Sequence, residues 1–264
     1  MRAYRVAYDG RPYHGFQRQP DVPTVEDAIV DALRELDVIE GGLDVPPGYA
    51  AAGRTDAGAS AVAQTVAFEV PTWLTPAALN GALPADVRAW ASTDAPADFH
   101  ATHDAAARAY TYYLHAPEAP EHRARRALDA LAGEHDFHNL TPDDTGTVRD
   151  LSTGLDRDGP FLALSFRAGG FPRQFVRRAV TLVADIARGD PLERIGRVLG
   201  TEGLSGPEGV APAPAYPLVL SEVVYPDLAF EIDEAAAENA REIFKQRRVE
   251  HATLARVAGV LADR

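Results

Sequence analysis

Short segments that alternate apolar and polar residues recur along the chain, and they constrain its fold most. Strands are predicted at residues 2–10, 61–70, 86–93, 107–116, 160–169 and 217–227. Helical segments and short turns separate these strands, a spacing that favours an α+β fold with largely antiparallel sheets over a doubly wound parallel sheet. We expect two α/β subdomains with helices on their outer faces and a cleft between them, comprising residues 1–104 and 105–264.

Helical periodicity marks the segments between the strands. In residues 24–36 the sequence TVEDAIVDALREL places its apolar side chains on one face, and Thr24 is in position to cap the helix. Residues 172–189 carry a second apolar stripe of this kind. A short helix is predicted at residues 75–83 and a further helix at residues 120–137. Acidic helices are predicted at the end of the chain, and a Pro/Gly loop at residues 205–217.

The charge of the chain is unusual in both amount and kind. There are 39 acidic and 26 basic residues, a net charge of −13, and Lys245 is the only lysine. A strongly acidic surface that is almost free of lysine indicates adaptation to high salt. The arginines gather with glycines and aromatic residues, as in GGFPRQFVRR, whereas the acids gather elsewhere. This distribution predicts a solvated acidic exterior around a cleft lined by arginine, which is compatible with RNA as a partner.

Composition also disfavours several classes of protein. The sequence has no cysteine, and therefore no disulfide, thiolate nucleophile or cysteine metal site. No apolar run approaches the ~20 residues needed to cross a bilayer. The first residues lack the apolar core of a signal peptide, so we expect a soluble cytoplasmic protein without a membrane partner. GRTDAGAS lacks the spacing and the lysine of a phosphate-binding loop.

A group of histidines leaves a metal site open as an alternative. FHATHD places His100, His103 and Asp104 within five residues, and EHDFHN holds two more histidines. Such clusters can ligate zinc or iron, but neither matches a known metal signature. Surface or core histidines are therefore favoured, and a metal-dependent hydrolase that uses the first cluster with Asp56 is the rival interpretation.

Asp56 lies in the segment GRTDAG, which is open to two interpretations. The flanking glycines permit an unusual backbone or the close approach of a ligand. Aspartate before Ala-Gly is also an ordinary turn former, because its side chain can accept hydrogen bonds from nearby backbone N–H groups. The residue is therefore either a turn carboxylate or a functional group presented at the start of a strand.

Two further segments combine arginine with aromatic or helical patterns. Arg108, Tyr110 and Tyr112 share one face of a predicted strand, which is either a stacking platform for a base or a surface covered by a helix. Arg173 and Arg177 are predicted to share one helix face after Gly169-Gly170, with Arg178 beside them. Ordinary solvent-exposed arginines are the alternative there.

The order of these segments resembles that of a known family. The chain carries, in sequence, AYDGRPYHGFQRQ, TVEDAI, GRTDAGASA, LNGALPADVR, FHATHDAAARAYTYYL, GGFPRQFVRR and YPLVLSEVVYPD. Together they resemble the tRNA pseudouridine synthases of the TruA type, from about residue 4 to residue 226. The resemblance implies an isomerase that converts uridine to pseudouridine in tRNA, around positions 38 to 40 of the anticodon stem-loop, as a homodimer and without a cofactor. A non-catalytic RNA-binding module that has kept the cleft is a second rival.

The resemblance assigns roles to particular residues. Asp56 corresponds to the essential carboxylate, Arg177 to the arginine paired with it, and Tyr110 to the active-site tyrosine that stacks on uracil. Arg54 corresponds to an arginine that fills the space left by the flipped base. RNA or substrate contacts are expected from Tyr13, Gln17, Arg18, Arg108, Phe171, Arg173 and Leu218.

The chain departs from the family pattern at three places. Ala59-Ser60 replaces the usual Val-His, Phe16 replaces a common tryptophan, and Tyr216-Pro217 precedes Leu218 where a Gly-Leu pair is usual. Two roles are compatible with the sequence at Asp56, which acts either as a nucleophile or by assisting a glycal-like intermediate.

Overall fold

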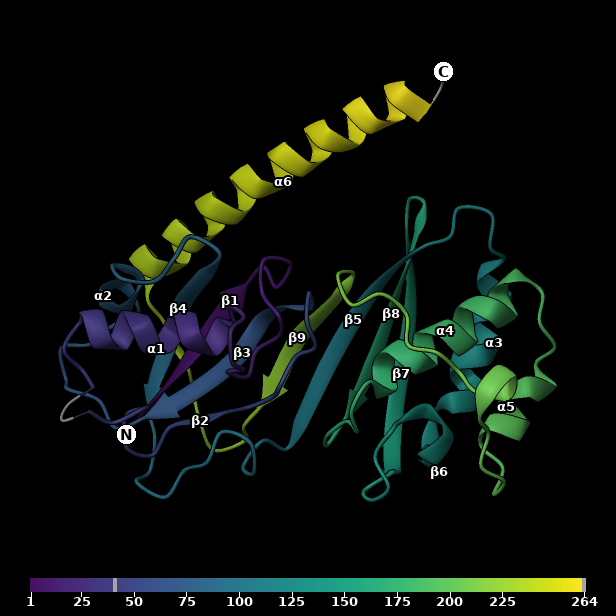
Figure 1. Ribbon diagram of the computed structural model, residues 1–264, viewed down its shortest axis with the longest axis horizontal. Helices are drawn as coiled ribbons and strands as arrows, with labels where there is room; N and C mark the ends of the chain where they lie inside the picture. The colour runs from purple at the N-terminus through teal and green to yellow at the C-terminus, as the bar shows by residue number, and fades with distance from the viewer. Residues whose placement is uncertain (40–41, 263–264) are drawn as a thin grey trace.

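One mixed sheet runs through the computed structural model, which describes residues 1–39 and 42–262 (Figure 1). Within these residues the sheet has ten strands in the order β10-β4-β1-β3-β9-β5-β8-β7-β6, and β2 pairs with β3 beside this path. The strands are β1 (Arg2–Tyr8), β2 (Ala50–Ala51), β3 (Ser60–Phe68), β4 (Val87–Asp94), β5 (Ala107–His115), β6 (Gly133–Asp136), β7 (Val148–Asp158), β8 (Phe161–Ala168), β9 (Leu218–Val224) and β10 (Glu231–Ile232).

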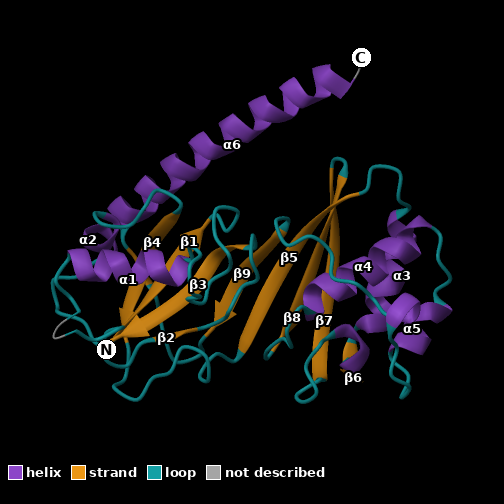
Figure 2. Ribbon diagram, in the orientation of Figure 1, coloured by secondary structure: helices purple, strands orange, loops and turns teal. Residues whose placement is uncertain are grey.

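The helices flank the two halves of this sheet, apart from the outer part of α6, which extends away from it (Figure 2). They are α1 (Val25–Glu35), α2 (Pro76–Asn80), α3 (Glu121–Leu131), α4 (Phe175–Arg188), α5 (Glu193–Val198) and α6 (Glu234–Ala262), with 3₁₀ turns η1 (His138–Leu140) and η2 (Gly206–Glu208). The predicted cap of α1 is present, because the Thr24 side chain accepts the N–H of Asp27. None of the described helices combines the length and the apolar character needed to span a membrane.

Strand β9 joins the two halves of the sheet. It lies between β3, to which it is parallel, and β5, to which it is antiparallel. Ser60 at the start of β3 is level with Val219, and Tyr110 in β5 is level with Leu220. A strand from late in the chain therefore brings the start of β3 next to the middle of β5.

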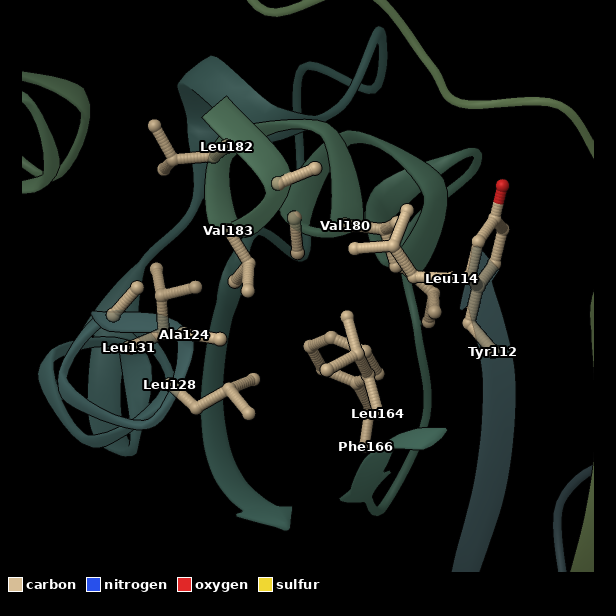
Figure 3. Packing of buried hydrophobic residues seen from close by; sticks show 14 of the residues in the cluster. Tyr112, Leu114, Ala124, Leu128, Leu131, Leu164, Phe166, Val180, Leu182 and Val183 are labelled. Carbon is tan, nitrogen blue, oxygen red and sulfur yellow. The ribbon is translucent and has the colours of Figure 1, made fainter. Parts of the chain in front are cut away.

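Two clusters of buried side chains underlie the two halves. One packs α1 on β1 and β3 through residues such as Ile29, Leu33, Tyr4 and Phe68. Figure 3 shows the other, in which α3 and α4 cover β5 and β8 through Leu128, Leu131, Val180, Val183, Tyr112, Leu114, Leu164 and Phe166. The α+β class, the mainly antiparallel sheet and the outer helices are confirmed. Because β10 and α6 return to β4, the boundary between residues 104 and 105 stays a prediction.

Two predicted elements were wrong in detail, and one long strand was not predicted. The helix expected to reach residue 137 ends at Leu131, where Ala132 is extended and Gly133 has φ +92°, and β6 follows. The acidic helices expected at the end are one helix, α6, which contacts β4 and α2 and then extends away from the sheet (Figure 1). Strand β7 was missed, because its mostly polar residues carry little apolar alternation.

Candidate active site

Asp56 lies in the turn between β2 and β3, and the buried residue before it, Thr55, sets the direction of the Asp56 side chain. The Thr55 side chain is 6% exposed and hydrogen-bonded to the Tyr8 hydroxyl at 2.8 Å. Gln64 closes the turn, since its amide nitrogen donates to the Gly53 carbonyl and its oxygen accepts the Gly53 N–H. Because Thr55 points inward, Arg54 and Asp56 on either side face the surface.

The segment from Gly10 to Phe16 packs directly against this turn. A Cβ on Gly10 would lie 1.9 Å from the Ala59 carbonyl oxygen, so no larger residue fits without moving the backbone. The Phe16 N–H donates to the Thr55 carbonyl at 3.1 Å, and the Tyr13 carbonyl accepts the Gly58 N–H at 3.2 Å. The Asp56 turn is thus held by a second loop from the N-terminal motif.

The replacement of Val-His by Ala59-Ser60 has a structural explanation here. Ala59 is 1% exposed beneath the close approach of Gly10. The Ser60 hydroxyl accepts the Gly10 N–H at 3.1 Å. These two residues therefore support the contact between the loops rather than reaching a ligand.

Arg177 reaches Asp56 from the first turn of α4. Its Nη1 donates to Asp56 Oδ2 at 2.7 Å, and its Nε donates to the Ala213 carbonyl at 2.6 Å. The Arg177 and Asp56 side chains are 17% and 28% exposed. The predicted pairing is present, and the two bonds hold the guanidinium in one orientation beside a partly dry carboxylate.

Tyr110 stands next to this pair on β5. Its ring makes an edge contact with the Phe171 ring at 5.3 Å, and Phe171 stacks on Phe175 at 5.8 Å. Burial raises the pKa of Tyr110 to about 12, so its hydroxyl keeps its proton at neutral pH. Tyr112, two residues on, is 3% exposed in the core under α4. One strand face thus serves both the cleft and the core.

Arg108 is bonded to the protein rather than presented to solvent. Its guanidinium donates to the carbonyl oxygens of Ala52, Thr102 and Gly169 at 2.5 to 3.0 Å. These three carbonyls belong to the Asp56 turn, the loop before β5 and the loop after β8. The contact of Arg108 with RNA stays a prediction, whereas its contact with all three loops is observed.

The prediction that Arg173 and Arg177 share one helix face is wrong. Helix α4 begins at Phe175, because Gln174 adopts a left-handed backbone with φ +60°. Arg173 lies in the preceding turn, where its Nε is 3.3 Å from Asp143 Oδ1 and its N–H donates to Asp143 Oδ2. Its side chain is 63% exposed at the edge of the cleft.

A cleft of about 1270 Å³ collects most of the predicted residues. It is lined by Gln17, Arg54, Asp56, Arg108, Tyr110, Phe171, Arg173, Arg177 and Leu218. Tyr13 and Arg18 are not among its lining residues, and Arg18 instead pairs with Asp27 at 2.9 Å. Further residues, which were not predicted to face the cleft, also line it, among them His14, His100, His103, Asp143 and Arg149. The histidines of FHATHD were visible as a cluster, but not as a wall of this cleft.

The geometry does not support the metal-dependent hydrolase. Within residues 1–39 and 42–262, no three His, Cys, Asp or Glu side chains are arranged to hold a metal ion. Asp104 accepts the backbone N–H of His100 at 2.7 Å, and Asp56 is paired with Arg177. Both carboxylates are engaged within the protein.

Comparison with known proteins decides the family. A protein named tRNA pseudouridine synthase A from Haloarcula marismortui is 59% identical over 273 residues, covering 100% of this chain and 99% of the relative. The chain belongs to the tRNA pseudouridine synthase A family. A member from Archaeoglobus fulgidus is 34% identical over 257 residues, covering 96% of this chain and 94% of the relative. No family model matches the chain.

The tRNA pseudouridine synthase A family is a family of isomerases. The organisms from which its similar members come agree with the acidic composition of this chain. A second relative, from Halobacterium salinarum, is 59% identical over 264 residues, covering 99% of this chain and 98% of the relative. Haloarcula and Halobacterium are halophilic archaea, and this chain shares with a protein adapted to high salt its acidic, lysine-poor composition. A chain of the archaeal box H/ACA Nop10–Cbf5 complex is 15% identical, with a TM-score of 0.36 over 82% of this chain and 46% of that one, too low for a structural argument.

Proposed function

We propose that this chain isomerises uridine to pseudouridine in tRNA, in the anticodon stem-loop around positions 38 to 40, and that it needs no cofactor. The ion pair of Asp56 and Arg177 at 2.7 Å, facing a cleft beside Tyr110, is the observation that carries the proposal. Family membership supports tRNA as the substrate. A binding module has no need for a carboxylate facing an anionic RNA, and this argues for chemistry at the site.

The reaction requires an ionised carboxylate near the sugar. The N1–C1′ bond of uridine breaks, the uracil turns, the C5–C1′ bond forms, and the proton lost from C5 is balanced by one gained at N1. Asp56 either attacks C1′ or assists departure of the uracil through a glycal-like intermediate. In both routes Arg177 holds the Asp56 carboxylate in one orientation and places a cation beside it in a partly dry cleft.

Tyr110 is proposed to hold the detached uracil and to move a proton. Its ring lies in the cleft against Phe171, and an aromatic face can stack on the base. Because burial raises its pKa to about 12, the hydroxyl is available as a proton donor at neutral pH. Leu218, 5% exposed, would form an apolar wall of the same pocket.

Arg54 is proposed to take the place of the flipped nucleotide. It is exposed at the cleft two residues before Asp56, separated from it by the buried Thr55. Extruding a base costs a few kcal/mol of stacking. A planar guanidinium that stacks on the neighbouring bases offsets part of this cost.

We also propose that the working form is a homodimer, with tRNA contacting both subunits. The outer half of α6 exposes large aliphatic side chains: Val249, Leu254, Val257, Val260 and Leu261. An apolar stripe of this kind favours a protein contact. In an antiparallel pair of α6 helices centred on Thr253, Glu250 would be level with Arg256 of the second copy, so the charges are complementary. Sedimentation of wild type and Val257→Asp tests this, since a monomeric wild type contradicts it.

The function is tested by incubating the protein with tRNA labelled in its uridines and mapping pseudouridine. Wild type is expected to produce pseudouridine in the anticodon stem-loop, and Asp56→Asn is expected to produce none. Asp129→Asn, an exposed position on α3, is the matched control and should react like wild type. Absence of product from wild type contradicts the activity, and turnover by Asp56→Asn contradicts the role of Asp56.

A further inference from the structure

Two histidine rings lie side by side on the wall of the cleft. His100 and His103 are both exposed, their ring centroids are 4.2 Å apart, and both line the cleft that contains Asp56. Neither ring has a role in the chemistry described above. Together they present aromatic surface to the cleft.

The turn that carries these histidines is fastened to the Asp56 turn. The Thr102 hydroxyl donates to the Ala51 carbonyl, and the Thr102 carbonyl accepts from Arg108 Nη2, both at 2.5 Å. Arg108 also donates twice to the carbonyl of Ala52, which lies four residues before Asp56. The buried guanidinium therefore sets the position of the histidine turn relative to the catalytic turn.

A hydrogen bond also selects the tautomer of His100. The backbone N–H of Thr102 lies 3.2 Å from His100 Nδ1 and can only donate. Nδ1 is therefore the acceptor, and the ring proton is on Nε2. His100 thus combines an aromatic face with one N–H donor, which are the two features by which a side chain reads an unstacked base.

We propose that His100 and His103 form a contact for a nucleobase next to the flipped uridine, and that Thr102, held by Ala51 and Arg108, is the positioning residue for this contact. The proposal rests on the proposed function, because it places a neighbouring nucleotide of the same RNA. A base is favoured over a phosphate, since Asp104 lies in the same turn and Glu26 lines the same cleft, and both would repel a phosphate.

The contact is tested with an anticodon stem-loop RNA, by measuring its affinity at several salt concentrations together with kcat and KM. The double variant His100→Ala/His103→Ala is expected to bind at least about fivefold more weakly and to show the loss in KM. His100→Phe/His103→Phe keeps stacking surface and should recover most of the affinity. His122→Ala, an exposed histidine on α3, is the control and should match wild type.

Three outcomes are informative. An affinity within twofold of wild type for the double alanine variant overturns the contact. Equal losses in the alanine and phenylalanine variants that disappear at high salt indicate a phosphate contact and also overturn it. If wild type binds this RNA but forms no pseudouridine, the proposed function fails, while the effect of the histidines on binding still decides the contact.

The positioning role needs a milder change than removal of Arg108, whose loss can unfold the three loops it joins. Thr102→Val removes the bond to Ala51 and keeps the shape of the side chain. It should raise KM about twofold or more with kcat retained, and should have no further effect in the double alanine background. An equal loss in both backgrounds, or a loss confined to kcat, overturns the positioning role.

Discussion

Asp56 and Arg177 are 121 residues apart in sequence and 2.7 Å apart in the structure. Asp56 lies in the turn before β3 and Arg177 in the first turn of α4, so the ion pair crosses the middle of the sheet. The strand between them, β9, comes from still later in the chain. Assembly of the candidate active site therefore requires both halves of the sheet.

Replacement of Arg177 by alanine should lower the activity at least about 100-fold, because the 2.7 Å bond from Arg177 orients the Asp56 carboxylate. The fold should persist, since Asp56 is 28% exposed and water can solvate it. Arg177→Lys should be intermediate, because an ammonium cannot bond Asp56 and Ala213 together. Pseudouridine formation and chemical unfolding measure both effects. Arg188→Ala, at the exposed end of α4, is the control; turnover of Arg177→Ala within a few-fold of it would refute the pairing.

Tyr110→Phe should keep the ring against Phe171 and lower kcat by about 100-fold or more, if the hydroxyl moves a proton. Since burial raises the pKa of Tyr110 to about 12, the wild-type rate should not fall through loss of this proton until the pH approaches that value. A pH–rate profile and single-turnover kinetics test this. An unchanged rate would mean that Tyr110 acts by packing alone.

Gly10→Ala should destabilise the protein by about 1–3 kcal/mol, because the new Cβ would meet the Ala59 carbonyl. Displacement of the backbone at Ala59 would also move Asp56, so activity should fall more than the loss of folded protein explains. Denaturant titration measures the free energy of unfolding, and kcat of the folded fraction measures the activity. Gly196→Ala on α5 meets no atom within 4 Å and should be neutral or stabilising. A Gly10→Ala protein as stable and active as the Gly196→Ala protein would contradict the close packing.

RNA binding should depend only weakly on salt. The guanidinium groups of Arg108, Arg149, Arg173 and Arg177 are already bonded to protein oxygens. Few of their N–H donors are left to bond phosphates, and the slope of log affinity against log salt should correspond to about three contacts or fewer. Affinity measured from low salt to molar KCl tests this, and a steep loss would show that phosphate attraction dominates recognition.

The local elements followed from residues that are close in sequence. Thr24 and the apolar stripe after it predicted α1 and its cap, and the alternation around Tyr110 predicted β5. The limits of local patterns are equally visible. Strand β7 carries little apolar alternation, and the left-handed Gln174 separates Arg173 from the helix that its spacing suggested.

By itself, the sequence determined most of the elements, the turn that carries Asp56 and the family resemblance, because these depend on short-range propensities and on ordered motifs. Only the tertiary structure decided that Arg108 fastens three loops and that His100 and His103 face the same cleft as Asp56. The reason is physical. Which side chains meet depends on the order and register of strands from distant parts of the chain, and the insertion of β9 between β3 and β5 leaves no local trace in the residues it brings together.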